Sequence, residues 1–195
     1  MSQTTTITTA PTTDVVSALG AASLCHLLND LMQALLPATY PIFQDEFGLS
    51  FTQVGLLTFV YQITASLFQP FIGHYTERHP LPYSLPVGMA SSLAGLLTLA
   101  YAPNFTILLI GGILLGLGSA IFHPEASRMA HAASGGKRGL AQSVFQLGSN
   151  FGSSIGPLLA AWIIVPKGQF SVIWFSVIAL LAIMVLSYVG KWYKS

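Results

Sequence analysis

A row of polar and ionisable residues interrupts the first long apolar stretch of the sequence. Spacings of three and four residues place its members on one face of a helix: His26, Asn29, Asp30 and Gln33. His26 and Asp30 are one turn apart, so the imidazole and the carboxylate can share a hydrogen bond. A charge at bilayer depth costs at least about 2.5–3.5 kcal/mol on insertion scales, so it needs a reason. The row therefore predicts a wet, proton-exchanging pathway, and the alternative is that it only binds neighbouring helices together.

A second ionisable group follows the fourth apolar stretch and contains His123, Pro124, Glu125 and Arg128. Pro124 has no N–H to donate, which leaves a backbone carbonyl open near His123 and Glu125. Arg128 follows Glu125 by three residues, so the two side chains can form an ion pair. These residues predict a gate or proton relay near the inner mouth, with Glu125 modulated by His123 and Arg128. The alternative is an ordinary ion pair at the end of a helix.

Amide side chains form further polar faces on two other stretches. At helical spacing, the fifth stretch carries Gln142, Gln146, Ser149, Asn150 and Ser153, and the second carries Gln62 and Gln69. If the faces of the first, second and fifth stretches converge, they line one cavity. The candidates for binding a solute there are Asn29, Gln33, Gln62, Gln146, Asn150 and Arg128. Contact between helices is the alternative role of the glutamines.

The composition requires a membrane to cover most of the surface. The chain has 195 residues, of which 53% are hydrophobic and 7% are charged, against about 25% charged residues in an average soluble domain. The net charge of +1 provides no basic stripe for nucleic acid. Cys25 is the single cysteine, which excludes an intrachain disulfide and a cysteine-based zinc site. We expect neither a metal nor a cofactor.

Six apolar stretches are long enough to cross the bilayer, which takes about 20 residues as a helix. They cover residues 15–43, 51–75, 83–101, 105–122, 140–165 and 170–189, and the fourth should continue toward Ala133 as a wetter helix. We therefore expect an all-α fold, with a disordered polar tail over residues 1–13 and one six-helix transmembrane bundle over residues 14–195.

The distribution of basic residues predicts an orientation. With the N-terminus in the cytoplasm, one side holds Arg78, Arg128, Lys137, Arg138, Lys191 and Lys194, and the other holds Lys167 with Asp45 and Glu46. The positive-inside rule then places both termini in the cytoplasm.

An internal repeat relates the second and fifth stretches. Residues 55–63, GLLTFVYQI, align with residues 139–147, GLAQSVFQL, and share Gly, Leu, Val and Gln. The two copies are three helices apart and therefore cross the membrane in opposite directions. Such an inverted 3+3 repeat is a recurrent plan of secondary transporters.

Glycines recur every four residues in the fifth stretch, at Gly148, Gly152 and Gly156, and Pro157 follows the last of them. The segment Gly-x-x-x-Gly-Pro formed by Gly152, Gly156 and Pro157 resembles the antiporter pattern of the major facilitator superfamily. Its helix 4 pattern, Arg-x-x-x-Gly-x-Gly, is met except that Gly112 replaces the arginine.

The superfamily's loop pattern Gly-x-x-x-Asp-Arg-x-Gly is met in part. Gly73 and Arg78 fit, Glu77 replaces the aspartate, and Pro80 replaces the last glycine. We expect gating and packing roles for the residues that these patterns share with the polar segments: Gly73, Glu77, Arg78, Pro124, Gly148, Gly152, Gly156 and Pro157.

Longer strings resemble the fosmidomycin-resistance branch of this superfamily. They are residues 26–33, 122–128, 133–136, 139–146 and 150–157. The resemblance implies a bacterial inner-membrane pump that exports a phosphonate antibiotic in exchange for protons. Members of the superfamily typically have twelve helices, and this chain resembles the N-terminal six. The partners implied are a C-terminal half or a second copy of the chain, together with a small-molecule solute, protons and the lipid bilayer.

Together these observations predict the N-terminal half of a proton-coupled efflux transporter for an anionic drug such as fosmidomycin. Asp30 with His26 is the first candidate for proton coupling, and Glu125 with His123 is the second. Two alternatives stay open: a half-size protein that homodimerises to transport another small organic solute, and a non-transporting membrane subunit. A water channel and a rhomboid-type protease are disfavoured, because the Asn-Pro-Ala and Gly-x-Ser-Gly motifs are absent.

Overall fold

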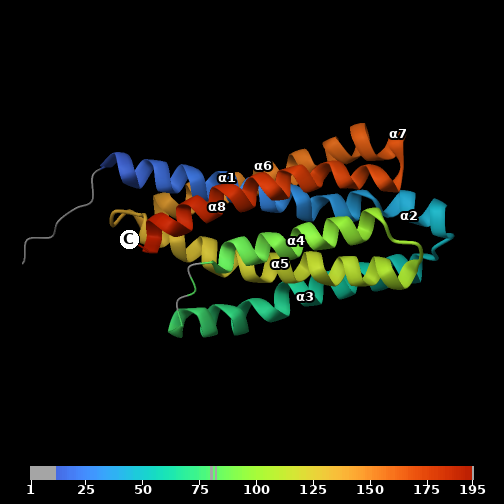
Figure 1. Ribbon diagram of the computed structural model, residues 1–195, viewed down its shortest axis with the longest axis horizontal. Helices are drawn as coiled ribbons and strands as arrows, with labels where there is room; N and C mark the ends of the chain where they lie inside the picture. The colour runs from blue at the N-terminus through green and yellow to red at the C-terminus, as the bar shows by residue number, and fades with distance from the viewer. Residues whose placement is uncertain (1–11, 80, 82, 195) are drawn as a thin grey trace, which may run out of the picture.

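The computed structural model describes residues 12–79, 81 and 83–194, and every regular element within them is helical. The elements form six rods that lie side by side along the long axis (Figure 1). The rods are α1 (Thr12–Ala38) with α2 (Tyr40–Phe47); α3 (Phe51–Arg78); α4 (Ser84–Ala100); α5 (Phe105–Ala132); α6 (Arg138–Leu159) with the π-helix η1 (Ala160–Ile164) and α7 (Val165–Lys167); and the 3₁₀ helix η2 (Gln169–Phe175) with α8 (Ser176–Lys194).

The helix boundaries correct three expectations. The first predicted span, residues 15–43, is interrupted at Thr39, because the ring of Pro41 would clash with the carbonyl four residues earlier in a continuous helix. The sixth span, residues 170–189, begins as a 3₁₀ helix. The predicted tail, residues 1–13, lies outside the described residues except for Thr12 and Thr13, with which α1 begins. The fourth span does continue to Ala132, as predicted.

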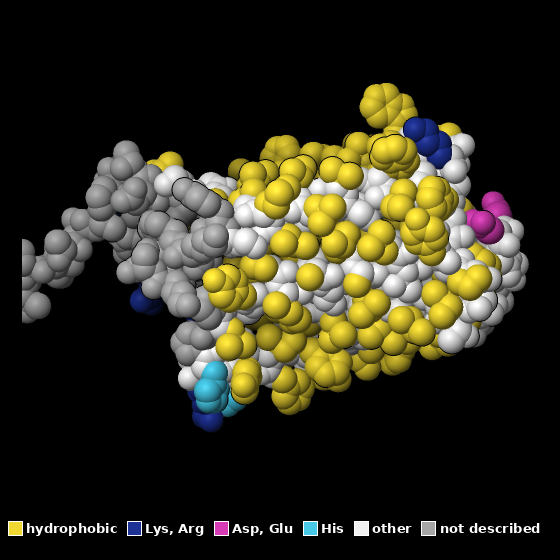
Figure 2. Space-filling view, viewed as in Figure 1, with side chains coloured by type: hydrophobic (Ala, Val, Ile, Leu, Met, Phe, Trp, Pro, Cys, Tyr) yellow, Lys and Arg dark blue, Asp and Glu magenta, His cyan; other side chains and the backbone are white. Residues whose placement is uncertain are grey.

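Apolar side chains cover the flank of the bundle. The helical stretches Phe51–Arg78, Phe105–Ala132, Arg138–Lys167 and Gln169–Ser187 are long and apolar enough to cross a membrane, and α4 is a shorter apolar helix. Large side chains point outward from these rods, and Trp162 is 81% exposed. Figure 2 shows this hydrophobic flank with charged side chains at the two ends. The chain is therefore a multi-pass membrane protein, whose outer surface is covered by lipid rather than water.

The two ends of the bundle differ in charge. The end of α8 and the start of α1 lie at one end of the bundle, which we call the termini end, and α2 and α7 lie at the other (Figure 1). The termini end carries the last turns of α3 and α5 and the start of α6, with Arg78, Arg128 and Arg138. The opposite end carries Asp45 and Glu46 in α2 and Lys167 in α7.

Three glycines bring α6 into backbone contact with α1, and we call this contact the α1–α6 seam. A Cβ atom at Gly148 would lie 2.0 Å from the Ser23 carbonyl oxygen, and one at Gly152 would lie 2.2 Å from that of Leu27. Gly156 faces Leu31 in the same way. Only glycine permits this approach.

A second close contact joins α3 to α5. A Cβ atom at Gly116 of α5 would lie 2.8 Å from the carbonyl oxygen of Tyr61 in α3, and the two helices pack along their lengths. The inverted repeat pairs the second rod with the fifth and the first with the fourth. Under this repeat, α1 corresponds to α5 and α6 corresponds to α3. A close contact between α1 and α6 therefore predicts one between α5 and α3, and the structure has both.

Candidate functional site

The carboxylate of Asp30 lies at the centre of a buried polar group, which we call the Asp30 cluster: His26, Asn29, Asp30, His123 and Ser149. Asp30 is 8% exposed. Its Oδ1 accepts a hydrogen bond from Asn29 Nδ2 at 2.8 Å, and its Oδ2 accepts one from the Ser149 hydroxyl. His26 Nε2 lies 3.4 Å from Oδ2, and His123 Nε2 lies 3.4 Å from Oδ1. The carboxylate is thus enclosed by side chains from α1, α5 and α6.

The two imidazole rings are oriented by backbone carbonyls. His26 Nδ1 lies 3.0 Å from the Phe145 carbonyl oxygen, and His123 Nδ1 lies 3.0 Å from that of Ser119. A carbonyl oxygen can only accept, so a hydrogen on Nδ1 satisfies both contacts and leaves the Nε2 of each neutral ring facing Asp30 without a hydrogen. The Ser119 hydroxyl also lies 3.2 Å from His123 Nδ1. Lone pairs then face lone pairs across 3.4 Å. A proton or another cation between them removes the repulsion.

A cavity of about 350 Å³ gives the cluster a path to the outside. The side chains of Asp30 and His123 form part of its wall. Its other polar lining residues come from α1, α3, α5 and α6, and they are Gln33, Tyr61, Gln62, Ser66, Gln69, Ser119 and Ser153. A solute in this cavity contacts the carboxylate and one of its two imidazoles.

The structure brings together part of the predicted solute-binding set. Gln33 and Gln62 line the cavity, although the Gln33 amide already donates to the Leu115 carbonyl at 3.2 Å. Asn29 is completely buried and is occupied by Asp30.

Gln146 and Asn150 are exposed on α6 but do not line the cavity, to which α6 contributes Ser153. Both amides lie two residues from Gly148, about 200° around the helix. Since Gly148 faces α1, the two amides point to the opposite side.

The second predicted group divides into two sites. Glu125, which is 6% exposed, binds Arg128 Nη2 at 2.5 Å and accepts a hydrogen bond from the Ser84 hydroxyl at 2.7 Å. Arg128 also reaches Thr76 of α3 at 3.4 Å. His123 does not pair with Glu125, because residues two apart on a helix point to different sides, and its ring lies against Asp30 instead. Glu125 and Arg128 therefore fasten α3, α4 and α5 near the termini end.

The remaining gating and packing residues lie around these sites. A Cβ atom at Gly73 would lie 3.3 Å from Pro124 Cβ, so α3 and α5 meet closely there. Pro124 lies inside α5, which continues to Ala132. Glu77 and Arg78 are exposed at the end of α3, and neither forms a salt bridge with another residue that the structure describes. Pro157 is followed by the π turn of η1.

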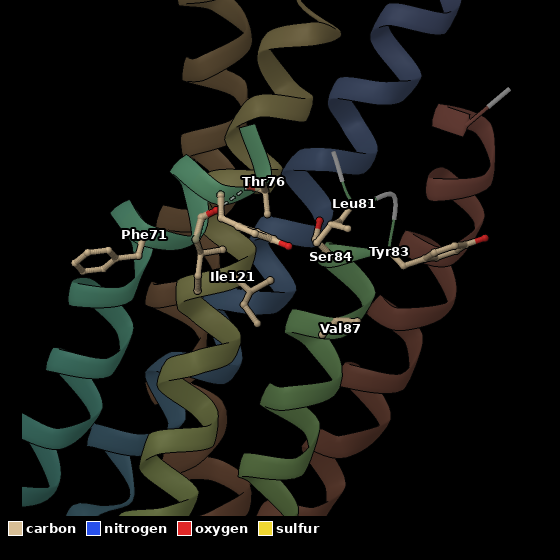
Figure 3. Close-up of a pocket in the computed structure, with 9 residues that line it drawn as sticks. Phe71, Thr76, Leu81, Tyr83, Ser84, Val87 and Ile121 are labelled. Atoms are coloured by element: carbon tan, nitrogen blue, oxygen red, sulfur yellow. Dashed lines mark hydrogen bonds between the residues drawn. The ribbon is translucent and has the colours of Figure 1, made fainter. Parts of the chain in front are cut away.

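A larger cavity, of about 520 Å³, lies between α3, α4 and α5 beside the Glu125–Arg128 pair. Figure 3 shows that its wall is made mainly of apolar and aromatic side chains, among them Phe71, Tyr83 and Val87. Its two small hydroxyls are already committed, since Thr76 donates to the Ile72 carbonyl and Ser84 donates to Glu125. This cavity offers little to a charged solute. The smaller cavity beside Asp30 is the candidate site.

Sequence comparisons agree with this architecture. Residues 22–194 match the family model of the Major Facilitator Superfamily. The chain is 54% identical over 177 residues to the fosmidomycin resistance protein of Escherichia coli (strain K12), covering 91% of this chain and 44% of that protein. It is 49% identical over 185 residues to the uncharacterized MFS-type transporter YfnC of Bacillus subtilis (strain 168), covering 95% of this chain and 45% of that protein.

The chain spans less than half the length of these two relatives. A more distant similarity, 26% identity over 122 residues, relates it to the multidrug resistance protein MdtH of Shigella dysenteriae serotype 1 (strain Sd197). The six-rod bundle and the family match lead to one conclusion: the chain belongs to the major facilitator superfamily, a family of membrane transporters.

Proposed function

We propose that this chain is the N-terminal half of a proton-coupled efflux transporter for a small anionic drug of the fosmidomycin type. The observation that carries the proposal is the Asp30 cluster at the wall of a cavity, in which two imidazole Nε2 atoms each lie 3.4 Å from an oxygen of the same carboxylate. The similarity to a fosmidomycin resistance protein supports the choice of substrate.

The geometry supports a distinct role for each side chain in this proposal. Asp30 and His26 hold the exchangeable proton in the buried part of the cluster, and His123 connects it to the cavity. A phosphonate or similar anion in the cavity is attracted by the protonated His123 ring. Gln62 and Gln69 provide amide groups on the opposite wall. Arg128 is less suited to bind the solute, because Glu125 already neutralises it.

The membrane potential is sufficient to drive such an exchange. Moving one elementary charge through about 100 mV is worth about 2.3 kcal/mol, which sustains a solute gradient of roughly fifty-fold. The bacterial relatives support the bacterial inner membrane as the location. The positive-inside rule favours an orientation with the termini end in the cytoplasm, since that end carries Arg78, Arg128 and Arg138.

Alternating access in secondary transporters moves one repeat or bundle against another, so we expect the six rods to need a partner. The test is fosmidomycin susceptibility of cells that express the chain alone, or together with the C-terminal half of the Escherichia coli relative. Resistance only with both halves supports the proposal.

Two other results of this test would change the assignment. Resistance from the short chain alone replaces the half-transporter with a homodimer. No resistance in either strain, with both polypeptides present in the membrane, rejects the drug as the substrate.

A further inference from the structure

We propose that the Asp30 cluster is also a binding site for a transition-metal cation, with Zn²⁺ as the best match. Its ligands are His26 Nε2, His123 Nε2 and a carboxylate oxygen of Asp30, and these atoms all lie within 4.8 Å of one another. Two imidazoles with one carboxylate form a ligand set typical of zinc sites. The metal ion is a third ligand of this site, in addition to the proton and the drug of the proposed function.

The spacing of the ligand atoms suits a small tetrahedral ion. Zinc binds imidazole nitrogen and carboxylate oxygen at about 2.0–2.2 Å, which separates neighbouring ligands of a tetrahedron by about 3.3–3.6 Å. His26 Nε2 lies 3.4 Å from Asp30 Oδ2, and His123 Nε2 lies 3.4 Å from Asp30 Oδ1, so each imidazole approaches a different oxygen of the carboxylate. Because the three ligand atoms lie within 4.8 Å of one another, binding one ion requires them to close in to tetrahedral spacing.

The surroundings of the ligands point to a cation as well. Metal-binding histidines usually donate their other ring hydrogen to a carbonyl or carboxylate, and both rings donate Nδ1–H to backbone carbonyls. Asn29 and the Ser149 hydroxyl hold the carboxylate. His26 is 1% exposed, yet its Nε2 has no hydrogen-bond partner among the described residues. This buried His26 nitrogen faces the Asp30 carboxylate, and it indicates a cation independently of the spacing of the three ligand atoms.

The fourth coordination position opens toward the cavity. Asp30 and His123 belong to its wall, so a water molecule or an anion from the cavity can complete the tetrahedron. Imidazole favours Zn²⁺, Co²⁺, Ni²⁺ and Cu²⁺ over Mg²⁺ and Ca²⁺, which prefer all-oxygen sites. Because His26 and Asp30 lie on α1 and His123 lies on α5, the bound metal also joins these two helices and restrains their movement.

The direct test is metal binding by the purified 195-residue chain in detergent. Co²⁺ is added first, and its visible absorption bands report a four-coordinate site. Zn²⁺ is then added to displace it, and calorimetry gives the stoichiometry. We expect one Zn²⁺ per chain and no competition by Mg²⁺. His26→Gln and His123→Gln should each weaken Zn²⁺ binding by at least tenfold, since loss of an outer-shell partner alone typically costs 10–100-fold.

Matched controls separate this site from the exposed histidines. His74→Gln, His79→Gln and His131→Gln replace imidazoles that are exposed, and they should leave the affinity unchanged. Size-exclusion profiles and helical circular dichroism establish that each variant is folded. In wild-type chain, Zn²⁺ should raise the midpoint of thermal unfolding and Mg²⁺ should not.

The inference is overturned if no four-coordinate Co²⁺ spectrum forms. It is also overturned if binding survives in His26→Gln and His123→Gln but disappears when the three exposed histidines are replaced. The assay requires no transport, so its failure would leave the proposed drug export untouched. Failure of the susceptibility test would likewise leave the metal site standing.

Discussion

At the residue scale, the main feature is a carboxylate that two imidazoles approach from different helices. His26 lies on the same helix as Asp30, and His123 comes from α5. Each ring is fixed by a carbonyl oxygen on its far side. Charge on Asp30 is thus faced by two imidazoles, side chains that can each carry a proton.

Replacement of Asp30 by asparagine tests this balance. Asp30→Asn keeps the size and polarity of the side chain but removes the negative charge that the two imidazoles face. We expect loss of proton-driven drug exchange in the assembled two-half transporter, with normal amounts of folded protein. The measurement is drug efflux from vesicles after an imposed pH difference.

The control for this variant is Asp45→Asn, which removes an exposed carboxylate in α2 by the same chemical change. It should lower exchange far less than Asp30→Asn does. Wild-type exchange in Asp30→Asn would remove this residue from the mechanism and turn attention to Glu125.

A second residue-scale prediction concerns the buried ion pair. Arg128→Gln leaves Glu125 without its cation, and Glu125 Oε1 already has no partner among the described residues. An unsatisfied buried group costs about 1–3 kcal/mol, and the 35% exposure of the Arg128 side chain places the effect at the lower end. We expect a lower midpoint of thermal unfolding in detergent.

The double variant Glu125→Gln/Arg128→Gln should recover part of this loss, because no charge is then left unpaired. Arg138→Gln, at an exposed position, serves as the charge control and should not change the midpoint. Equal loss in the double and single variants would show that Arg128 acts through packing rather than through its charge.

At the scale of the elements, the α1–α6 seam sets the tightest demand on the backbone of a neighbouring helix. Gly148→Ala places a Cβ atom on the Ser23 carbonyl oxygen, where backbone rather than a flexible side chain must yield. Overpacking of this kind costs about 1–3 kcal/mol or more. We expect a clear fall in the midpoint of thermal unfolding.

Gly55→Ala is the matched control, since nothing lies within 4 Å of a Cβ atom at that helical position. It should stabilise the chain slightly, by about 0.5–1 kcal/mol, because alanine favours the helix. Equal stability of the two variants would mean that the seam is looser than the structure indicates.

The spacing of polar residues predicted much of the site, but not how each helix is rotated. The row on α1 and its link between His26 and Asp30 follow from helical periodicity, which is local. The contact between Asp30 and His123 depends on how α5 crosses α1, and no local pattern encodes that. The amides of α6 show the same limit, because the glycines on that helix determine which face meets α1. Pro41 indicates the interruption at Thr39, but the prediction of one continuous span followed the apolar pattern, which runs through both residues without a break.

At the scale of the whole molecule, exposed polar groups stand out on a flank that is otherwise apolar. Gln62 on α3, and Gln146 and Asn150 on α6, are exposed. Amides exposed to lipid are costly, so we expect a protein partner or water to cover these side chains. The exposed amides of α3 and α6 therefore mark where a second half should dock.

Cysteine accessibility tests this placement. Gln146→Cys in a Cys25→Ser background should react with a water-soluble maleimide in the chain alone, and its reaction rate should change at least severalfold when the C-terminal half of the relative is present. Phe59→Cys provides a comparison on α3, the helix that carries Gln62. The Phe59 side chain is 60% exposed. An unchanged rate at residue 146 would place the partner on another face.

The α1–α6 seam has one more consequence, for how movement and chemistry are connected. His26, Asp30 and Ser149 all lie on the two helices that the glycines bring into backbone contact, so we expect their mutual distances to change little when other helices move. His123 is the one titratable member carried by another helix. When the cavity opens or closes, we expect the distance between the Asp30 carboxylate and the His123 imidazole to be the one that changes. That distance then couples the position of the surrounding helices to the chemistry of the site.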